Sequence, residues 1–556
     1  MFWNDPITYV GNQIKKIRPS VRWTFAMTIL VGILVHFYSM SHKFFNYFEM
    51  GNIFSKMPFL QEDTVALGRW FMPIATNLFT SFSMPVWNTL ICLFYMAVAS
   101  ALVVDLLQIR SRVYGVLFGL CFVTFPGFTC VLSYGVNCDE ITLALLLAIL
   151  AAYLFFKVRY GIVWGIVLLC LSLAAYQPYM SLTIGVIYMM LFMKAYREKL
   201  EWKPFLILVG RSVLMLAAGF ILYYALLQAM VAGLGITLSD YHGVDSMTSF
   251  TPKGIVKGLV YSYGYFLAYF FSTEYIYTIS RIVINVIGAV AFFALLIRRT
   301  GEQKAEGRSV SVLWMWVLLC FLPLGCNSAP FLMADRVGSG VDRYMIFSLM
   351  FLWALLLAML DDVRAGSVCE AQEADRKQED VAEGQQEHAG VVGKPVWNLA
   401  QWAGCFAVVT AILTGVIIDN QAYHRMEAMT ETTGSLLNRI AARMEEQPEW
   451  NKDIPVYFVN CRALVNLNYD VEIPEYDAIR NMPGTFLRSS YSEEAIVKYM
   501  EVYLHFPISE ATEEERRRVE ENPLFDRMES YPSESSVQII DGVMVVKISD
   551  GEEIIE

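Results

Sequence analysis

Apolar residues in this chain gather into runs of about twenty residues, separated by short polar connections. A helix rises 1.5 Å per residue, so a run of this length crosses the ~30 Å hydrocarbon layer of a membrane. A helix also pairs its own backbone groups, for which lipid offers no partners. The pattern predicts about eleven membrane-spanning helices. They are expected at 22–41, 85–108, 113–132, 140–156, 161–176, 179–195, 204–233, 276–297, 309–325, 343–360 and 399–418.

Lysine and arginine are distributed unevenly between the connections. If the N-terminus is cytoplasmic, every cytoplasmic connection is basic, as the positive-inside rule requires. The outer connections at 133–139 and 177–178 contain neither residue type. An odd number of spans then places the C-terminal part outside the cytoplasm. We therefore expect a multi-pass protein of a bacterial-type (inner) cell membrane.

The spans divide the chain into four expected parts. Residues 1–361 form a transmembrane catalytic region of ten helices, and 362–398 form a flexible cytoplasmic linker rich in Glu, Gln, Asp and Gly. The last transmembrane helix is 399–418, and 419–556 form an extracytoplasmic domain. The predicted fold class is an all-α polytopic membrane protein with a small extracytoplasmic α+β C-terminal domain.

The C-terminal part has its own pattern of apolar residues. Helical spacing predicts a helix at about 420–446, and Val456–Val459 reads as a strand. Two further strands, 537–540 and 543–548, flank Asp541-Gly542, a dipeptide typical of a tight hairpin.

Composition agrees with a membrane protein and excludes some functions. The chain is 56% hydrophobic and 17% charged, with a mean hydropathy of +0.45. The net charge is −11, and the acidic residues concentrate near 361–387 and beyond 425, which argues against nucleic acid as a partner. No paired-cysteine metal or redox motif occurs among the ten cysteines, so no cofactor is expected. A divalent metal stays open, since Glu62 and Asp63 are oxygen ligands of the kind that hard cations prefer.

Acidic, basic and aromatic residues converge in the outer connections. Four acids are candidate general bases: Glu49, Glu62, Asp63 and Asp139. Such a carboxylate can take a proton from a sugar hydroxyl that attacks an anomeric carbon. Arginine suits a phosphate leaving group, and aromatic faces stack on sugar rings. The candidate substrate-binding residues are Arg69, Trp70, Tyr176, Gln177, Tyr179, Arg336, Arg343 and Tyr344.

Simpler roles compete with these functional interpretations. Glu62 and Asp63 are also typical of a first helical turn, and Asp139 of a helix N-cap. Arginines at helix ends also anchor a helix at the membrane surface. The aromatic series 261–271 is typical of an interfacial amphipathic helix, and His36 suits a helix-packing role.

The order of these features resembles the Gtr-type (O-antigen-modifying) glucosyltransferases, integral membrane enzymes of GT-C architecture. The matching residues are Asn46–Glu49, Leu67–Phe71, Phe125-Pro126, Asp139, Ala175–Tyr179, Asp342–Tyr344 and Asp419–Tyr423. The resemblance implies a polyprenyl-phosphate-glucose donor and a lipid-linked or cell-surface polysaccharide acceptor. It also implies transfer with inversion and an acidic base in the first outer loop. The family commonly has Asp where Glu49 stands, so Glu62 and Asp63 remain alternatives for the base.

Two other functions stay open. A transporter or flippase of lipid-linked saccharides would place ionisable residues near the middle of the membrane, often in broken helices. Most charges here lie at the level of the connections, which favours surface chemistry. A polymerase or ligase of surface polysaccharide would share the outer arginines.

Overall fold

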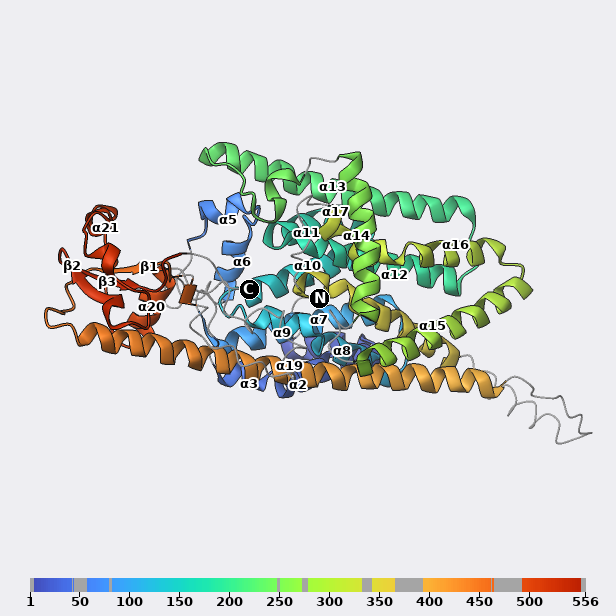
Figure 1. Ribbon diagram of the computed structural model, residues 1–556. Helices are drawn as coiled ribbons and strands as arrows, with labels where there is room; N and C mark the ends of the chain where they lie inside the picture. The colour runs from blue at the N-terminus through green and yellow to red at the C-terminus, as the bar shows by residue number, and fades with distance from the viewer. Residues whose placement is uncertain are drawn as a thin grey trace, which may run out of the picture.

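The computed structural model describes residues 5–42, 44, 58–79, 83–247, 251–272, 279–332, 343–365, 394–461, 463–464 and 493–551. It is mostly helical, with a small sheet near the C-terminus. Figure 1 shows the helical bundle and, at one end of it, the unit that contains the sheet.

Most helices lie in the bundle. Their bounds are α1 Pro6–Lys16, α2 Pro19–Val35, α3 Phe37–Ser41, α5 Glu62–Ala66, α6 Met72–Phe79, α7 Pro85–Leu106, α8 Arg112–Val123, α9 Pro126–Leu132, α10 Cys138–Lys157, α11 Gly161–Ala175, η1 Gln177–Tyr179, α12 Met180–Arg197, α13 Trp202–Leu234, η2 Tyr241–Ser246, α14 Pro252–Phe271, α15 Ile279–Ala305, α16 Ser309–Cys320, α17 Leu322–Leu332, η3 Arg343–Met350 and α19 Lys394–Glu445. A further helix, Met345–Ala365, overlaps η3.

Seven helices of the described residues are long and apolar enough to cross a membrane, as a polytopic membrane protein requires. The number rises to nine if two bent pairs, α1 with α2 and α8 with α9, each form one span. Helices α11 and α16 match expected spans but are shorter. The count of eleven therefore stays a prediction.

Proline accounts for a break inside one expected span. Helix α8 ends at Val123 and α9 begins at Pro126, with a bend of 48° between them. Proline has no N–H to continue the ladder of the preceding helix, but it fits the first turn of a new one. The expected single helix 113–132 is thus two helices.

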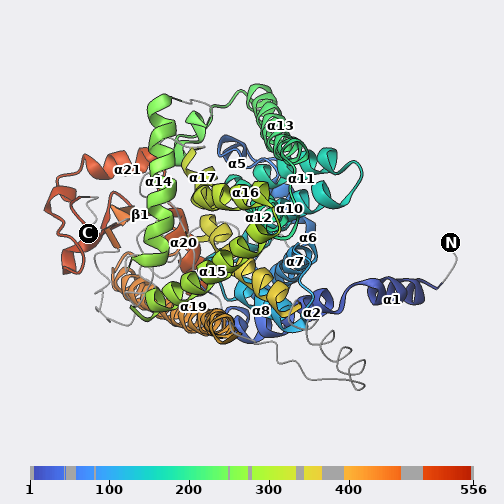
Figure 2. The same ribbon diagram turned by 90° about the vertical axis from the view of Figure 1, so that its right-hand side faces the viewer.

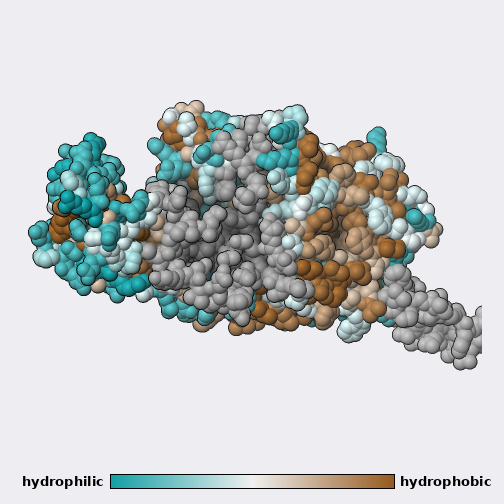
Figure 3. Space-filling model, viewed as in Figure 1, coloured by the Kyte–Doolittle hydropathy of each residue, from teal (hydrophilic) through white to brown (hydrophobic). Residues whose placement is uncertain are grey.

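Helix α14 runs across the direction of the other long helices (Figures 1 and 2). This orientation agrees with the expectation of an interfacial helix at 261–271, although the helix is longer and begins at Pro252. Figure 3 shows that the surface beside α14 and over α15 and α16 is largely hydrophobic.

One continuous helix, α19, joins the bundle to the C-terminal unit (Figure 1). We expected a span at 399–418 followed by a helix at about 420–446, and the structure joins these two segments in one helix. The chain contains no proline between Pro395 and Pro448, and Asp419 is buried within the helix. Nothing in the sequence therefore interrupts the backbone hydrogen bonds between the two segments.

The C-terminal unit contains the three expected strands. β1 (Val456–Val459) pairs in parallel with β3 (Val543–Lys547), and β3 pairs antiparallel with β2 (Val537–Ile540). Asp541 and Gly542 connect β2 to β3 with φ of 50° and 79°, the left-handed conformation that this type of hairpin requires. Helix α20 (Glu493–Tyr503) and the end of α19 share an apolar core with the sheet. Helix α21 (Glu513–Glu520) adds Val519 to a smaller core.

The expected linker 362–398 is helical at both ends, since 362–365 belong to the helix Met345–Ala365 and α19 begins at Lys394. The intervening residues 366–393 lie outside the described part.

Helix α19 packs closely against the break between α8 and α9. A Cβ added to Gly415 would overlap the Thr124 carbonyl oxygen, a backbone atom that cannot rotate away. We expect Gly415→Ala to lower the melting temperature of purified protein in detergent by several degrees. Gly210→Ala in α13 is the control, because nothing lies within 4 Å of its added Cβ. Equal melting temperatures for the two variants would contradict this packing.

Candidate functional site

Two adjacent carboxyl groups are buried at the N-terminus of α10. Asp139 and Glu140 belong to its first turn and are 2% and 1% exposed. The partial positive charge of a helix N-terminus favours acidic groups there. Asp139 interacts electrostatically with Tyr95 of α7, and Glu140 with Arg69. The two carboxyls thus interact electrostatically with different parts of the bundle.

Arg69 reaches this site from the turn between α5 and α6. Its backbone N–H donates to the Thr64 carbonyl oxygen at 2.7 Å. Its guanidinium lies over the ring of Tyr176, 5.1 Å from the centroid, a cation–π arrangement. Gly68 makes the turn possible, with φ of 71°, a conformation that other residues rarely adopt.

The break between α11 and α12 supplies the aromatic part of the site. Tyr176 and Tyr179 are 1% and 0% exposed, and their rings meet edge to face at 4.9 Å. Gln177 Nε2 donates to the Leu67 carbonyl oxygen at 2.7 Å and to the Tyr223 hydroxyl at 3.2 Å. The side chain of Gln177 therefore ties this break to the turn that carries Arg69.

Tyr223 of α13 completes the connection. Its hydroxyl donates to the Gly68 carbonyl oxygen at 2.9 Å. Trp70 is buried in the same apolar cluster as Tyr223, together with Leu169 and Leu173 of α11. The arginine is thus held by a rigid turn whose carbonyl oxygens are paired with side chains of other helices.

The structure brings together five of the residues proposed from the sequence: Arg69, Trp70, Tyr176, Gln177 and Tyr179. A sixth, Asp139, is next in the chain to Glu140, which interacts with Arg69. Glu62 and Asp63 are exposed in the first turn of α5. Acidic side chains are common in this position because they stabilise the helix, with no further role needed.

The remaining candidates are not placed. Glu49 and Arg336 lie outside the described residues. Arg343 and Tyr344 begin η3, but their side chains are not described.

Two residues of the site were not among the sequence candidates. Glu140 is as buried as Asp139, and its Oε2 atom has no hydrogen-bond partner in the described part of the chain. Its position next to another acid, at the start of an apolar run, could have identified Glu140 from the sequence. Tyr223 could not have been identified from the sequence, because tyrosines are common within long apolar helices.

A second buried polar group lies where α19 crosses the bundle. His36 Nε2 donates to the Val123 carbonyl oxygen at 2.8 Å, and Nδ1 lies 2.6 Å from the Tyr423 hydroxyl. Thr129 donates to Asp419 Oδ1 at 2.6 Å. His36 therefore has the helix-packing role expected from the sequence. The motif Asp419–Tyr423 contributes to this packing rather than to the Arg69 site.

No group of three or more His, Cys, Asp or Glu residues that could hold a metal occurs among the described residues. Glu62 and Asp63 lie next to each other, but their exposed side chains show no third ligand in the described part of the chain.

The close contacts at Gly68 yield a stability test of the site. A Cβ on Gly68 would lie 2.6 Å from the Tyr223 hydroxyl and 2.7 Å from Gln177 Nε2. Gly235 has nearly the same φ, 69°, but open space around it. Both alanine variants strain the backbone, and only Gly68→Ala also disrupts the hydrogen bonds. We expect Gly68→Ala to lower the melting temperature in detergent more than Gly235→Ala. Equal decreases in melting temperature would mean that the contacts at Gly68 contribute nothing to stability.

Comparison with known proteins gives one match. The family model described as Glucosyl transferase GtrII matches residues 37–355, more than half of the chain. This region contains α10, the turn with Arg69 and the break with Tyr176 and Tyr179. No curated protein and no solved structure matches. The chain belongs to the GtrII glucosyl transferase family.

Proposed function

We propose that this protein transfers a hexose, glucose, from a polyprenyl-phosphate-sugar donor to a lipid-linked or cell-surface polysaccharide. The reaction takes place at the outer face of the membrane. The observation that carries the proposal is the pair of buried carboxyls at the start of α10, of which Glu140 interacts electrostatically with Arg69, within the region that the family model matches.

Each group has a chemical role in this reaction. An acceptor hydroxyl attacks the anomeric carbon as the bond from that carbon to the phosphate oxygen breaks. The Asp139 carboxylate takes the hydroxyl proton, as general-base catalysis requires. The lipid phosphate leaves with the bonding electron pair, and the Arg69 guanidinium binds its oxygens. Tyr176 holds the guanidinium in place by cation–π contact.

Burial supports this use of Asp139 over the exposed acids of α5. An electrostatic interaction is stronger in a site from which water is excluded. Glu62 and Asp63 are exposed to solvent and lack this advantage. Glu49 remains a proposed base by family resemblance, since nothing in the described residues bears on it.

The arrangement of the bundle supports an outer site. Helix α5 and the C-terminal unit lie toward one end of the bundle in Figure 1, and the connection from α15 to α16 lies toward the other. The last turns of α15 and this connection carry Arg298, Arg299, Lys304 and Arg308. Basic residues beside a membrane span mark the cytoplasmic side, which supports the α5 end as the outer one.

Removing the charge of the proposed base tests the mechanism. Asp139→Asn should reduce transfer from polyprenyl-phosphate-glucose by roughly a hundredfold or more, because general-base catalysis contributes that much. The purified protein is assayed for donor consumption and product formation. The control is Asp245→Asn, which neutralises an exposed acid of η2. Transfer by Asp139→Asn at the wild-type rate, with intact folding, would exclude Asp139 as the base. Consumption of no polyprenyl-phosphate sugar by the wild type would instead favour transport.

The orientation is tested by labelling from outside. We expect a membrane-impermeant maleimide to label a Glu501→Cys variant in spheroplasts, because Glu501 is exposed in the C-terminal unit. A Glu201→Cys variant, exposed between α12 and α13, should react only after the membrane is opened. The unsubstituted chain gives the background from native cysteines. The reverse labelling pattern would refute the orientation.

A further inference from the structure

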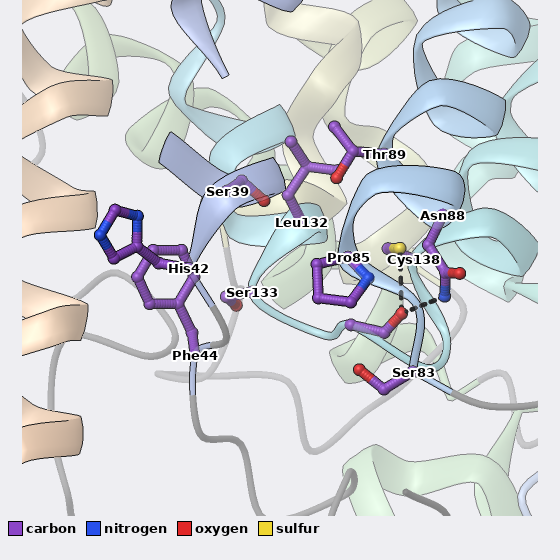
Figure 4. Close-up of a pocket in the computed structure, with 11 residues that line it drawn as sticks. Ser39, His42, Phe44, Ser83, Pro85, Asn88, Thr89, Leu132, Ser133 and Cys138 are labelled. Carbon is purple, nitrogen blue, oxygen red and sulfur yellow. Dashed lines mark hydrogen bonds between the residues drawn. The ribbon is translucent and has the colours of Figure 1, made fainter. Parts of the chain in front are cut away.

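Two pockets in the described part of the bundle differ in size and lining. The first, beside the N-terminus of α10, has a volume of about 20 Å³, which holds one water molecule and no larger ligand. Asn88 Nδ2 and Cys138 Sγ both donate to the Gly135 carbonyl oxygen there (Figure 4). These bonds fix the start of α10 against α7, so the first pocket has a structural role.

The second pocket is an apolar groove with a volume of about 360 Å³, within the range of ligand-binding pockets. It is lined by α14, α15, the junction of α16 and α17, and the helix Met345–Ala365. Leu267, Phe271 and Phe293 line it and are also exposed. Figure 3 shows a largely hydrophobic surface in this region. The groove therefore opens on a surface suited to the hydrocarbon layer.

The lining of the apolar groove matches a hydrocarbon chain. No charged side chain of the described residues contributes to it, and aromatic and aliphatic side chains dominate. The Tyr263 hydroxyl donates to the Cys320 carbonyl oxygen at 2.8 Å, and Asn285 Nδ2 donates to the Phe270 carbonyl oxygen at 3.0 Å. Both donors are thus used within the protein. A chain in this groove is held by packing against side chains, which is the main attraction available between apolar groups inside a membrane.

Helix α17 connects the apolar groove to the Arg69 site. Its first residues line the groove, and a Cβ on Gly325 would meet the Tyr188 ring. Tyr188 lies about two turns into α12, whereas η1, which contacts α17, immediately precedes α12. Helix α17 therefore runs from the groove back toward η1, and η1 ends at Tyr179 of the site.

The length of α17 sets the distance that a bound lipid must cover. Its 11 residues span about 16 Å at 1.5 Å per residue. Phe331, near its far end, packs against the Tyr265 ring of α14 with centroids 5.5 Å apart, so apolar side chains continue along this path. A polyprenyl chain whose phosphate is bound at Arg69 covers this distance with its first isoprene units.

We propose that the apolar groove holds the polyprenyl chain of the donor, several isoprene units from the phosphate, and that the chain follows α17 between the two. The position of the phosphate at Arg69 rests on the proposed function. The protein then distinguishes long donors from short ones, because a chain shorter than α17 ends before it reaches the groove.

Filling the apolar groove tests this inference. Ala289 lines it, whereas the neighbouring Val290 is exposed and is not among the described lining residues. We expect Ala289→Trp to raise the KM for undecaprenyl-phosphate-glucose roughly tenfold, because many weak contacts along the chain are lost at once. The KM for geranyl-phosphate-glucose, whose chain is shorter than α17, should stay unchanged. Val290→Trp is the matched control and should keep both wild-type values.

Two results would overturn the inference while the proposed function stands. One is a wild-type KM of Ala289→Trp for the undecaprenyl donor. The other is an equal increase in KM for both donors, which would mean that the substitution acts on the protein as a whole.

Photolabelling of the purified wild type does not depend on transfer. Undecaprenyl phosphate with a diazirine several isoprene units from the phosphate should label peptides of α14 and α15. Excess unlabelled undecaprenyl phosphate should suppress this labelling, and phosphatidylglycerol should not. Equal suppression by both lipids would identify the groove as a site for ordinary membrane lipid, and labelling confined to other helices would also overturn the inference. If labelling behaves as expected but no polyprenyl-phosphate sugar is consumed, the proposed transfer fails and the chain-binding groove stands.

Discussion

Backbone groups at the breaks between helices need partners inside the protein, because hydrocarbon offers none. In this chain, side chains of other helices supply them. His36 donates to the carbonyl oxygen of Val123, Gln177 to that of Leu67, and Asn88 to that of Gly135. Each of these bonds joins segments distant in sequence. The hydrogen bonds that pair the backbone carbonyl groups at the breaks therefore also fix the relative positions of α3, α7, α10 and the turn with Arg69.

Long periodic segments were predictable because their signal is local. Apolar runs identified α7, α10, α12, α13 and α15, and a two-residue turn identified the β2–β3 hairpin. Helix ends were less predictable: Pro126 divided one expected span, and the absence of proline after Pro395 merged two expected helices. Both outcomes follow from whether a backbone N–H is present to continue the hydrogen-bond ladder.

The candidate site was predictable in part, since its acids, arginine and tyrosines lie at helix ends. Asp139, Arg69 and Tyr176 were found this way. Tyr223 was not, because its contact with Gly68 depends on how α13 packs beside α5. Contacts between helices cannot be inferred from the periodicity of a single sequence.

The length of α19 has a mechanical consequence. Its 52 residues form a rod about 78 Å long at 1.5 Å per residue. Asp419 and Tyr423 attach this rod to the bundle through Thr129 and His36. The segment beyond Asp419 extends to the C-terminal unit, so a tilt of about 5° at this attachment moves the far end by roughly 3 Å. The rod therefore joins the C-terminal unit to the helix break at Pro126 through one continuous run of backbone hydrogen bonds.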